Sequence, residues 1–303
     1  MPEWRAELEI DAALVRRLLA EQFPELELTS LQLVGEGWDN AVWLVDRRWL
    51  FRFPRREAAV RSAELQTALL PRLAPLLPLP IPEPLFAGRP DQGYPWPFLG
   101  MAFLPGREPA DVAPDDPMRA RAARPLGAFL RALHAPEVLD VEGIESLPVD
   151  PLRRADMAFR VERARTRLAE VRELGVWEPP PEAEQLLAEA EKLPPSPRIS
   201  VVHGDLHPRH LLVDDSGVPT GIVDWDDCCR ADPAIDLVLY WAYLPPSARP
   251  EFVAVYGEPD EASLLRGRVL ALFICSAVAA YGHMEKLAGV EREAVAALDR
   301  AMT

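Results

Sequence analysis

The stretch "VVHGDLHPRHLLVDDSGVPTGIVDWDD", residues 201–227, holds three of the chain's five histidines within eight residues. These histidines crowd around Asp205, and Asp224 follows after the apolar run "GIV". The Asp214–Gly217 segment has the composition of a tight turn, so residues 211–227 are predicted to form a β-hairpin. Such a hairpin returns the chain on itself. We therefore expect both carboxylates to reach the same cleft.

The histidines His203, His207 and His210 are spaced as i, i+4 and i+7. On a helix they would share one face and could bind zinc. Gly204 and Pro208 argue against a helix, because glycine adds backbone entropy and proline removes a hydrogen bond. We therefore predict a loop that follows a short strand. A zinc hydrolase is retained as an alternative, and it predicts tightly bound zinc.

The two carboxylates suit different tasks, since Asp205 is placed to accept a proton and Asp224 to hold a hard cation. "HGDLHPRH" followed by "IVDWDD" resembles the catalytic and metal loops of the aminoglycoside and macrolide phosphotransferase family, and the resemblance covers nearly the whole chain. It implies a protein-kinase-like fold in which Asp205 orients or deprotonates the substrate hydroxyl and Asp224 binds magnesium. Trp225 stands where the kinase D-F-G motif has phenylalanine.

The family pattern has an asparagine at the position of His210. An imidazole nitrogen suits softer metals better than an amide oxygen does. Macrolide kinases nevertheless resemble this chain in carrying histidine there. We expect His210 to ligate the metal, with positioning of Asp205 as the alternative. His207 is expected to shape the loop or steady the transferred phosphoryl group, and His203 to anchor the loop by hydrogen bonds.

The segment "GEGWDN", residues 35–40, lies between two predicted strands and matches G-x-G-x-x-N. Gly35 and Gly37 would let the backbone approach nucleotide phosphates, and Asn40 tolerates the left-handed region. The kinase pattern also needs a cation on the third strand. No lysine occurs in the first 191 residues, so Arg52 in "FRFPR" is predicted to take that role. Its guanidinium can hold phosphate by two parallel hydrogen bonds.

A helix predicted over residues 57–74 should carry the side chain that orients Arg52. Alignment on "LLPRL" puts Gln66 at the family's glutamate position. Two residues on a helix differ by about 200°, so only one of Glu64 and Gln66 can face the arginine. A cation in a cleft favours an anionic partner, so Glu64 is predicted.

Two further segments carry the resemblance. "GMAFLPG", residues 100–106, resembles the hinge of the family, which implies that backbone groups of Ala102 and Leu104 pair with the purine edge and that Phe103 lies between them. Backbone pairing does not distinguish ATP from GTP. In "RADPAIDLVLYW" the resemblance implies that Asp236 ties down the backbone of the catalytic loop.

The hydrophobic pattern predicts an α+β protein. An amphipathic helix is expected over 7–22, and strands over 28–35, 41–46 and 49–55. With two later extended segments these give an antiparallel sheet of about five strands plus a helix, and the chain becomes mainly helical after Gly106. The resemblance to the phosphotransferase family implies that these elements form a bilobal protein-kinase-like fold. Its N-terminal nucleotide-binding lobe would span residues 1–104, and its helical catalytic and acceptor-binding lobe residues 105–303.

Composition excludes some classes. A net charge of −15 argues against nucleic-acid binding, because phosphate backbones need a basic surface. Three cysteines without a CxxC pattern favour reduced thiols, and the start "MPEWRAELEI" lacks the apolar run of a signal peptide. The apolar run 269–282 is expected to be a buried helix too short to span a bilayer. We expect a cytoplasmic monomer or homodimer with no nucleic-acid or membrane partner.

These observations predict an ATP- or GTP-dependent O-phosphotransferase that uses Mg²⁺ and a small hydroxylated acceptor. The resemblance implies an antibiotic, either a macrolide or an aminoglycoside, and is closest to the macrolide-kinase branch. Asp226 and Asp227 could attract a cationic acceptor, and Tyr240, Trp241 and Tyr281 could line an apolar pocket. The alternatives are a kinase of a housekeeping metabolite, such as an amino alcohol or sugar, and a non-catalytic nucleotide-binding protein.

Overall fold

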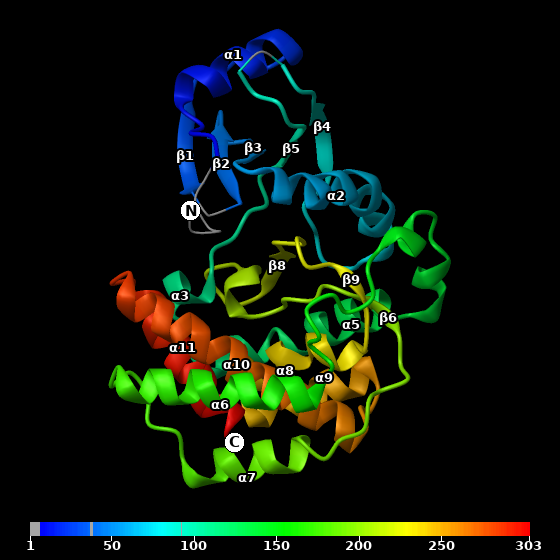
Figure 1. Cartoon of the computed structure of the whole chain (residues 1–303), viewed down its shortest axis with the longest axis vertical. Helices are drawn as coiled ribbons and strands as arrows, with labels where there is room; N and C mark the ends of the chain where they lie inside the picture. Colours follow the sequence, from blue (N-terminus) through cyan, green and yellow to red (C-terminus); the bar gives the residue numbers. More distant parts are fainter. Residues whose placement is uncertain (1–6, 37–38, 92) are drawn as a thin grey trace. The chain divides into compact units, whose positions relative to one another are not determined.

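The computed structural model describes residues 7–36, 39–91 and 93–303 (Figure 1). The chain divides into two compact units. The N-terminal unit runs to Pro75 and resumes over Ile81–Leu104. The C-terminal unit takes Leu76–Pro80 and then Pro105–Thr303. A short piece of the first hundred residues therefore belongs to the C-terminal unit, which a single boundary in the sequence does not capture.

The N-terminal unit is built on one antiparallel sheet with the strand order β1-β2-β3-β5-β4. Its elements are α1 (Ala12–Gln22), β1 (Leu31–Glu36), β2 (Asn40–Val45), β3 (Trp49–Pro54), α2 (Val60–Leu73), β4 (Pro84–Gly88) and β5 (Phe98–Ala102). The prediction of about five antiparallel strands plus a helix is confirmed. The first helix is shorter than predicted and begins where the Asp11 side chain caps the amide of Leu14 at 2.8 Å.

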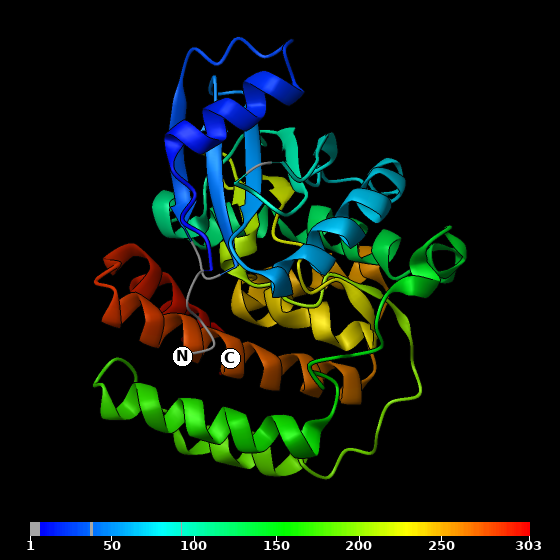
Figure 2. The same cartoon turned by 45° about the horizontal axis from the view of Figure 1, so that its top comes forward.

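The two faces of the sheet pack against different helices. Phe51 and Phe53 are fully buried in a cluster with residues of α1, which crosses the strands in Figure 2. Alternate residues of a strand point to opposite faces. Leu50 accordingly packs with Ala63 of α2 on the other face. Arg52 shares that face, so the strand alternation directs its side chain toward α2.

The C-terminal unit is mainly helical, as predicted. Its helices are α3 (Pro109–Val112), α4 (Asp116–Ala120), α5 (Ala123–Leu133), α6 (Met157–Glu173), α7 (Pro181–Ala190), α8 (Val238–Ala242), α9 (Arg249–Tyr256), α10 (Glu261–Met284) and α11 (Ala288–Ala301). Two small antiparallel sheets complete it, with β6 (Ser200–Val202) beside β9 (Cys229–Ala231) and β7 (Leu211–Val213) beside β8 (Pro219–Ile222).

Helix α10 is the packing centre of this unit and contacts α6, α8 and α11. The apolar run 269–282 was expected to be too short to span a bilayer. The structure corrects this, because the helix extends over 24 residues and is long and apolar enough to cross a membrane by length and composition alone. In its most apolar window 61% of the helix is buried within the unit, as in the core helix of a globular protein.

A buried ion pair joins α4 to α11 in the C-terminal unit. Arg119 on α4 donates two hydrogen bonds, of 2.8 and 2.6 Å, to the two carboxylate oxygens of Glu293 on α11. Arg300 adds a third bond of 2.8 Å to the same carboxylate. The side chains of Arg119 and Glu293 are 5% and 8% exposed. Nothing in the sequence pattern predicted this pair, since its partners lie far apart in the chain.

We expect Glu293→Ala to lower the free energy of unfolding by about 3–5 kcal/mol, because it leaves buried guanidinium groups without their carboxylate. Glu184→Ala, which removes an exposed partner of Arg165, should cost under about 1 kcal/mol. Urea denaturation measures both. A Glu293→Ala protein as stable as the Glu184→Ala control would contradict the importance of this buried pair.

Candidate active site

The histidine-rich segment is a loop, as predicted. Strand β6 ends at Val202, and the loop closes with a single 3-10 turn over Pro208–His210. Proline begins this turn, where its missing N–H costs nothing, and Nδ1 of His207 accepts the amide of Arg209 at 3.3 Å. The three histidines therefore do not share a helix face.

His203 anchors the loop, as the sequence predicted. Its ring is fully buried, and Nε2 lies 2.9 Å from the carbonyl oxygen of Val223. Nε2 therefore carries the proton, and Nδ1 accepts the amide of Asp205 at 3.3 Å. Burial lowers the pKa of His203, so the ring is neutral at physiological pH. One neutral imidazole thus ties the loop of Asp205 to the segment that precedes Asp224.

Asp236 fixes the backbone of the same loop. Its buried carboxylate accepts the amides of His203 at 2.8 Å and of Gly204 at 3.0 Å. Nε2 of His134 lies 3.1 Å from the same carboxylate. Burial alone would raise the pKa of Asp236, but the hydrogen bond and charge of His134 hold it below its ordinary value. The anionic carboxylate occupies the position that the resemblance predicted.

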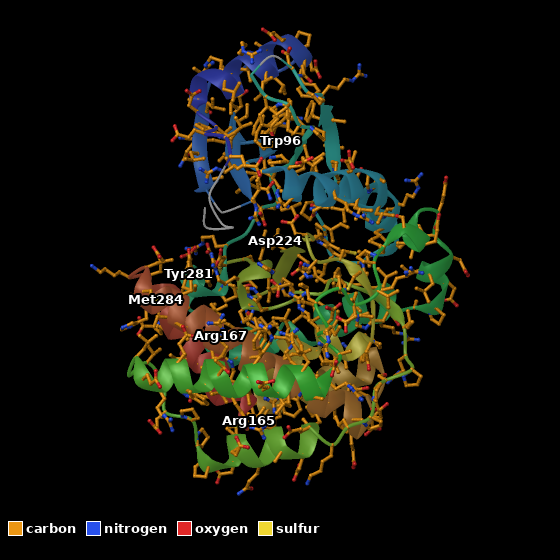
Figure 3. All side chains as sticks on the ribbon, in the orientation of Figure 1. Trp96, Arg165, Arg167, Asp224, Tyr281 and Met284 are labelled. Carbon is orange, nitrogen blue, oxygen red and sulfur yellow. The ribbon has the colours of Figure 1, made fainter. Side chains whose placement is uncertain are left out.

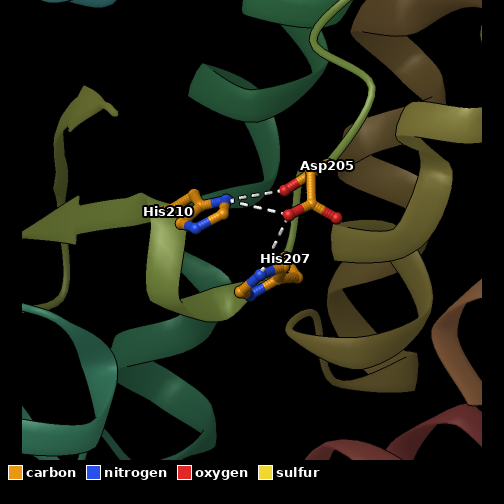
Figure 4. A group of neighbouring side chains, drawn as sticks. All are labelled: Asp205, His207 and His210. Carbon is orange, nitrogen blue, oxygen red and sulfur yellow. Dashed lines mark hydrogen bonds and ion pairs between the residues drawn. The ribbon is translucent and has the colours of Figure 1, made fainter. Parts of the chain in front are cut away.

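Two imidazole rings turn toward Asp205 in Figure 4. Nε2 of His207 lies 3.6 Å from Oδ2 of Asp205, and Nδ1 of His210 lies 3.8 Å from the same oxygen. Burial would raise the pKa of Asp205, but His207, His210 and Arg154 hold it well below its ordinary value. Burial also lowers the pKa of His207 to about 4. At neutral pH the site therefore contains an aspartate anion beside a neutral His207.

Asp224 lies beyond the strand that was predicted to end at it. Strand β8 stops at Ile222, and Asp224 follows in the left-handed region with φ of 64°. This conformation is strained for a residue other than glycine, although aspartate tolerates it better than most. The carboxylate oxygen Oδ2 lies 3.4 Å from Nε2 of His210. The backbone turn thus brings the predicted metal residue to the imidazole.

The ring of His210 is oriented by the backbone of the loop. Its Nδ1 donates to the carbonyl oxygen of Asp205 at 2.7 Å, which directs Nε2 toward Asp224. Neighbouring ligands of an octahedral Mg²⁺ ion, each about 2.1 Å away, lie about 3 Å apart. The 3.4 Å separation of Nε2 and the Asp224 oxygen fits such a pair. A second cluster of ligand atoms, from Asp205, His207 and His210, also lies within 4.8 Å.

One cavity of about 380 Å³ contains these groups. Asp205, His207, His210 and Asp224 line it together with Arg209, and five residues of α10 form an opposing wall. The five are Phe273, Ile274, Ala277, Val278 and Tyr281. Figure 3 labels Asp224 and Tyr281 on the C-terminal unit. The predicted convergence of two carboxylates in one cavity is therefore observed, and the wall beside them is apolar.

The other two aromatic residues predicted for this pocket lie elsewhere. Nε1 of Trp241 donates to the carbonyl oxygen of Leu264 at 2.9 Å, and its ring packs against the guanidinium groups of Arg249 and Arg268. Tyr240 is 9% exposed and packs on Trp241. These two side chains belong to the core, so of the three only Tyr281 lines the cavity.

Arg154 is a site residue that the sequence analysis missed. Its Nη2 lies 3.1 Å from Oδ1 of Asp205 and 2.6 Å from Oδ2 of Asp227. Of the two acids predicted to attract an acceptor amine, Asp227 is bound to Arg154, whereas Asp226 is exposed. The sequence offered no signal for Arg154, which lies 51 residues before Asp205 in a run with another arginine.

The N-terminal unit holds the residues predicted to bind nucleotide. Gly35 lies on β1 opposite Val42, and Asn40 begins β2. Gly37 lies outside the described residues. Arg52 is half-buried on β3, and its Nη1 lies 3.3 Å from Oε1 of Gln66.

The prediction that Glu64 orients Arg52 is wrong. Glu64 is exposed, whereas Gln66 is 5% exposed and contacts the arginine. The two residues are about 200° apart around α2, so burial of one turns the other to solvent. The preference of Arg52 for an anionic partner did not decide the contact. The rotation of α2 decided it, because it turns Gln66 toward Arg52 and Glu64 toward solvent.

The predicted hinge residues lie at the end of β5, with Ala102 as its last residue and Phe103 and Leu104 directly after it. The amide of Phe103 donates to the carbonyl oxygen of Arg48 at 2.8 Å, so it continues the β3–β5 ladder. Because backbone groups alternate along a strand, those of Ala102 and Leu104 are directed away from β3. The Phe103 side chain is 44% exposed. This arrangement is compatible with the predicted pairing to a purine edge.

Comparison with known proteins assigns the family. The phosphotransferase enzyme family model matches residues 30–270, and the chain belongs to this family. The resemblance that the histidine and aspartate loops predicted is therefore confirmed. The chain is accordingly assigned to a family of phosphotransferases.

Solved structures show the same fold. Aminoglycoside 2'-phosphotransferase-IIIa in its GDP complex is 22% identical, with a TM-score of 0.69 over 96% of this chain and 98% of that chain. Macrolide 2'-phosphotransferase MphH from Brachybacterium faecium is 23% identical, with a TM-score of 0.57 over 95% and 97%. These similarities confirm the predicted kinase-like fold.

A curated relative matches over a shorter stretch. The uncharacterized protein YcbJ of Bacillus subtilis (strain 168) is 42% identical over 66 residues. The match spans 22% of this chain and 18% of that protein's length.

Gly204 gives a test of the loop geometry. Its φ is 88°, and a Cβ there would lie 2.3 Å from the carbonyl oxygen of Asp227. Gly175 has φ of 69° with nothing within 4 Å of such a Cβ. We expect Gly175→Ala to cost about 1–2 kcal/mol from its left-handed backbone alone. Gly204→Ala should cost a further 1–3 kcal/mol, roughly, from overpacking, and should lower turnover.

Urea denaturation and initial rates measure the two glycine variants side by side. Equal stabilities together with full turnover for Gly204→Ala would show that the loop does not depend on this close approach.

Proposed function

We propose that the chain is an ATP- or GTP-dependent kinase that phosphorylates a hydroxyl of a small molecule with an apolar face. One observation carries the proposal: Asp205 and Asp224 line the same cavity, and His210 lies between them within 3.8 and 3.4 Å of their carboxylates. An anion that can receive a hydroxyl proton and a pair that can hold a cation thus lie side by side.

Asp205 would bind the acceptor hydroxyl and receive its proton. The depressed pKa makes it an anion at neutral pH, so it is a weak base. Phosphoryl transfer demands positioning and charge stabilisation more than a strong base, because the transition state is loose. The proposed work of Asp205 is therefore mainly to align the oxygen for in-line attack. His207, neutral and buried, would hold the loop around this carboxylate.

His210 and Asp224 would hold the Mg²⁺ ion. A bound ion would neutralise charge on the phosphates, which is what this class of reaction requires. Imidazole is an unusual ligand for magnesium, and a site made of an imidazole and a carboxylate would also bind Mn²⁺. The short hydrogen bond from Nδ1 to the backbone of the loop fixes the ring orientation that this role needs.

The N-terminal unit would bind the nucleotide. Gly35, Gly37 and Asn40 would surround the phosphates, and Arg52, oriented by Gln66, would supply the cation that the kinase pattern requires. Backbone groups of Ala102 and Leu104 would pair with the purine. A related aminoglycoside phosphotransferase with this fold binds GDP, which supports a nucleotide role without deciding between ATP and GTP.

The cavity favours an acceptor such as a macrolide over an aminoglycoside. Its α10 wall is mostly apolar, and its acidic lining residues are the two assigned to catalysis and metal. Asp227, the nearby acid that could have bound an amine, is held by Arg154. An apolar ring could pack on Ala277, Val278 and Tyr281 of this wall.

Two variants test the assigned roles. Asp205→Ala should reduce turnover by about 10²–10⁴-fold, because the acceptor hydroxyl loses its partner, and should leave nucleotide affinity nearly unchanged. Asp224→Ala should remove the metal dependence of nucleotide binding. Asp215→Ala, an exposed acid in the same hairpin, should behave as the wild type. Isothermal titration and phosphate incorporation distinguish these effects.

Near-normal turnover of Asp205→Ala, or unchanged metal-dependent affinity in Asp224→Ala, would remove the respective role. Nucleotide binding in the wild type without transfer to any acceptor would favour the non-catalytic alternative.

The acceptor wall has its own test. We expect a panel of macrolides, aminoglycosides and hydroxylated metabolites, each with ATP and GTP, to give phosphate incorporation into macrolides. Ala277→Trp should place an indole ring in the cavity where the acceptor would bind. We expect it to raise the acceptor KM by about tenfold or more and to leave the nucleotide KM unchanged. Incorporation only into an aminoglycoside or a small metabolite, with Ala277→Trp unaffected, would contradict the apolar-wall assignment.

A further inference from the structure

The turn before α6 brings a buried arginine to the catalytic loop. Arg154 is 9% exposed, and its Nη2 contacts Oδ1 of Asp205 at 3.1 Å and Oδ2 of Asp227 at 2.6 Å. We propose that Arg154 is a positioning residue that fixes the rotamer of Asp205 and neutralises the neighbouring Asp227. This inference rests on the proposed role of Asp205 in binding the acceptor hydroxyl.

The backbone that presents Arg154 is shaped for this contact. The Asp150 carboxylate accepts the amides of Arg154 at 2.7 Å and of Ala155 at 2.9 Å. Both Asp150 and Arg153 have positive φ, of 35° and 53°. Such conformations cost about 1–3 kcal/mol each in residues other than glycine and persist only where the surroundings enforce them. The turn therefore holds the arginine in one place at a cost in backbone strain.

The turn and the catalytic loop share one support. The amide of Asp150 donates to the carbonyl oxygen of Arg230 at 3.0 Å, and Arg230 lies on β9. Strand β9 pairs with β6, the strand that leads directly into the loop of Asp205. A guanidinium and a carboxylate that are far apart in sequence are thus fixed to the same two-stranded sheet. The β6–β9 sheet therefore fixes the distance between Arg154 and Asp205.

The two carboxylate oxygens of Asp205 have different partners. Oδ1 is bound by Arg154, whereas Oδ2 lies within 3.6 Å of His207 and 3.8 Å of His210 in the lining of the cavity. An acceptor hydroxyl would therefore meet Oδ2. If the guanidinium were absent, the carboxylates of Asp205 and Asp227 would face each other without a cation, and their repulsion would turn Asp205 out of this rotamer.

Four variants separate positioning from simple support of the fold. Arg154→Ala should lower kcat by about 100-fold, the cost of a small misplacement in an active site, with the nucleotide KM unchanged. Arg154→Lys should recover part of kcat, because an ammonium keeps the charge but not the planar fork. Arg154→Ala with Asp227→Asn should recover about tenfold over Arg154→Ala alone, as coupled neighbours do. Arg165→Ala, a control on α6, should match the wild type.

A crystal structure of the Arg154→Ala protein supplies a readout that does not depend on activity. We expect the Asp205 carboxylate to leave its present rotamer while Asp236 keeps its bonds to the loop. An unchanged Asp205 rotamer would overturn the proposal, as would a kcat within threefold of the wild type or strictly additive losses in the double variant. If the wild type transfers no phosphate, the proposed function fails, and the rotamer alone decides the role of Arg154.

Discussion

The buried carboxylate of Asp236 is the constraint on which the active site depends. A charge this deep in the protein is tolerated only when every oxygen has a partner. Its partners are the amides of His203 and Gly204 and the imidazole of His134. These bonds dictate the path of the loop and place Asp205 at its exit. The left-handed glycine and the buried histidine are thus consequences of satisfying one anion.

Around that loop the site balances opposite charges at short range. His207 lies beside Asp205 as a neutral ring, because burial lowers its pKa to about 4. The permanent positive charge comes from Arg154, which also binds Asp227. The chain has a net charge of −15 and only two lysines. The cation that contacts Asp205 and Asp227 is an arginine, whose planar guanidinium has a fixed hydrogen-bonding geometry. The pair proposed to hold the metal, His210 and Asp224, lines the same cavity as Asp205.

Local chemistry made much of the fold and half of the site predictable. The hairpin after His210, the loop before it and the alternation of β3 all follow from turn residues and hydrophobic period. Contacts between distant segments were not predictable, because neither Arg154 nor the α10 wall has a local pattern that marks it. The choice between Glu64 and Gln66 failed for a second reason: it required the rotational phase of the helix, and a shift of two residues turns a side chain by about 200°.

The central claim is that the loop pair His210 and Asp224 holds the cation while Asp205 stays free for the acceptor. A crystal grown with Mn²⁺ and a non-hydrolysable nucleotide tests this through the anomalous signal of manganese. We expect a peak bonded to Nε2 of His210 and to the Asp224 carboxylate. A peak bonded instead to Asp205, His207 and His210, with Asp224 unligated, would contradict it.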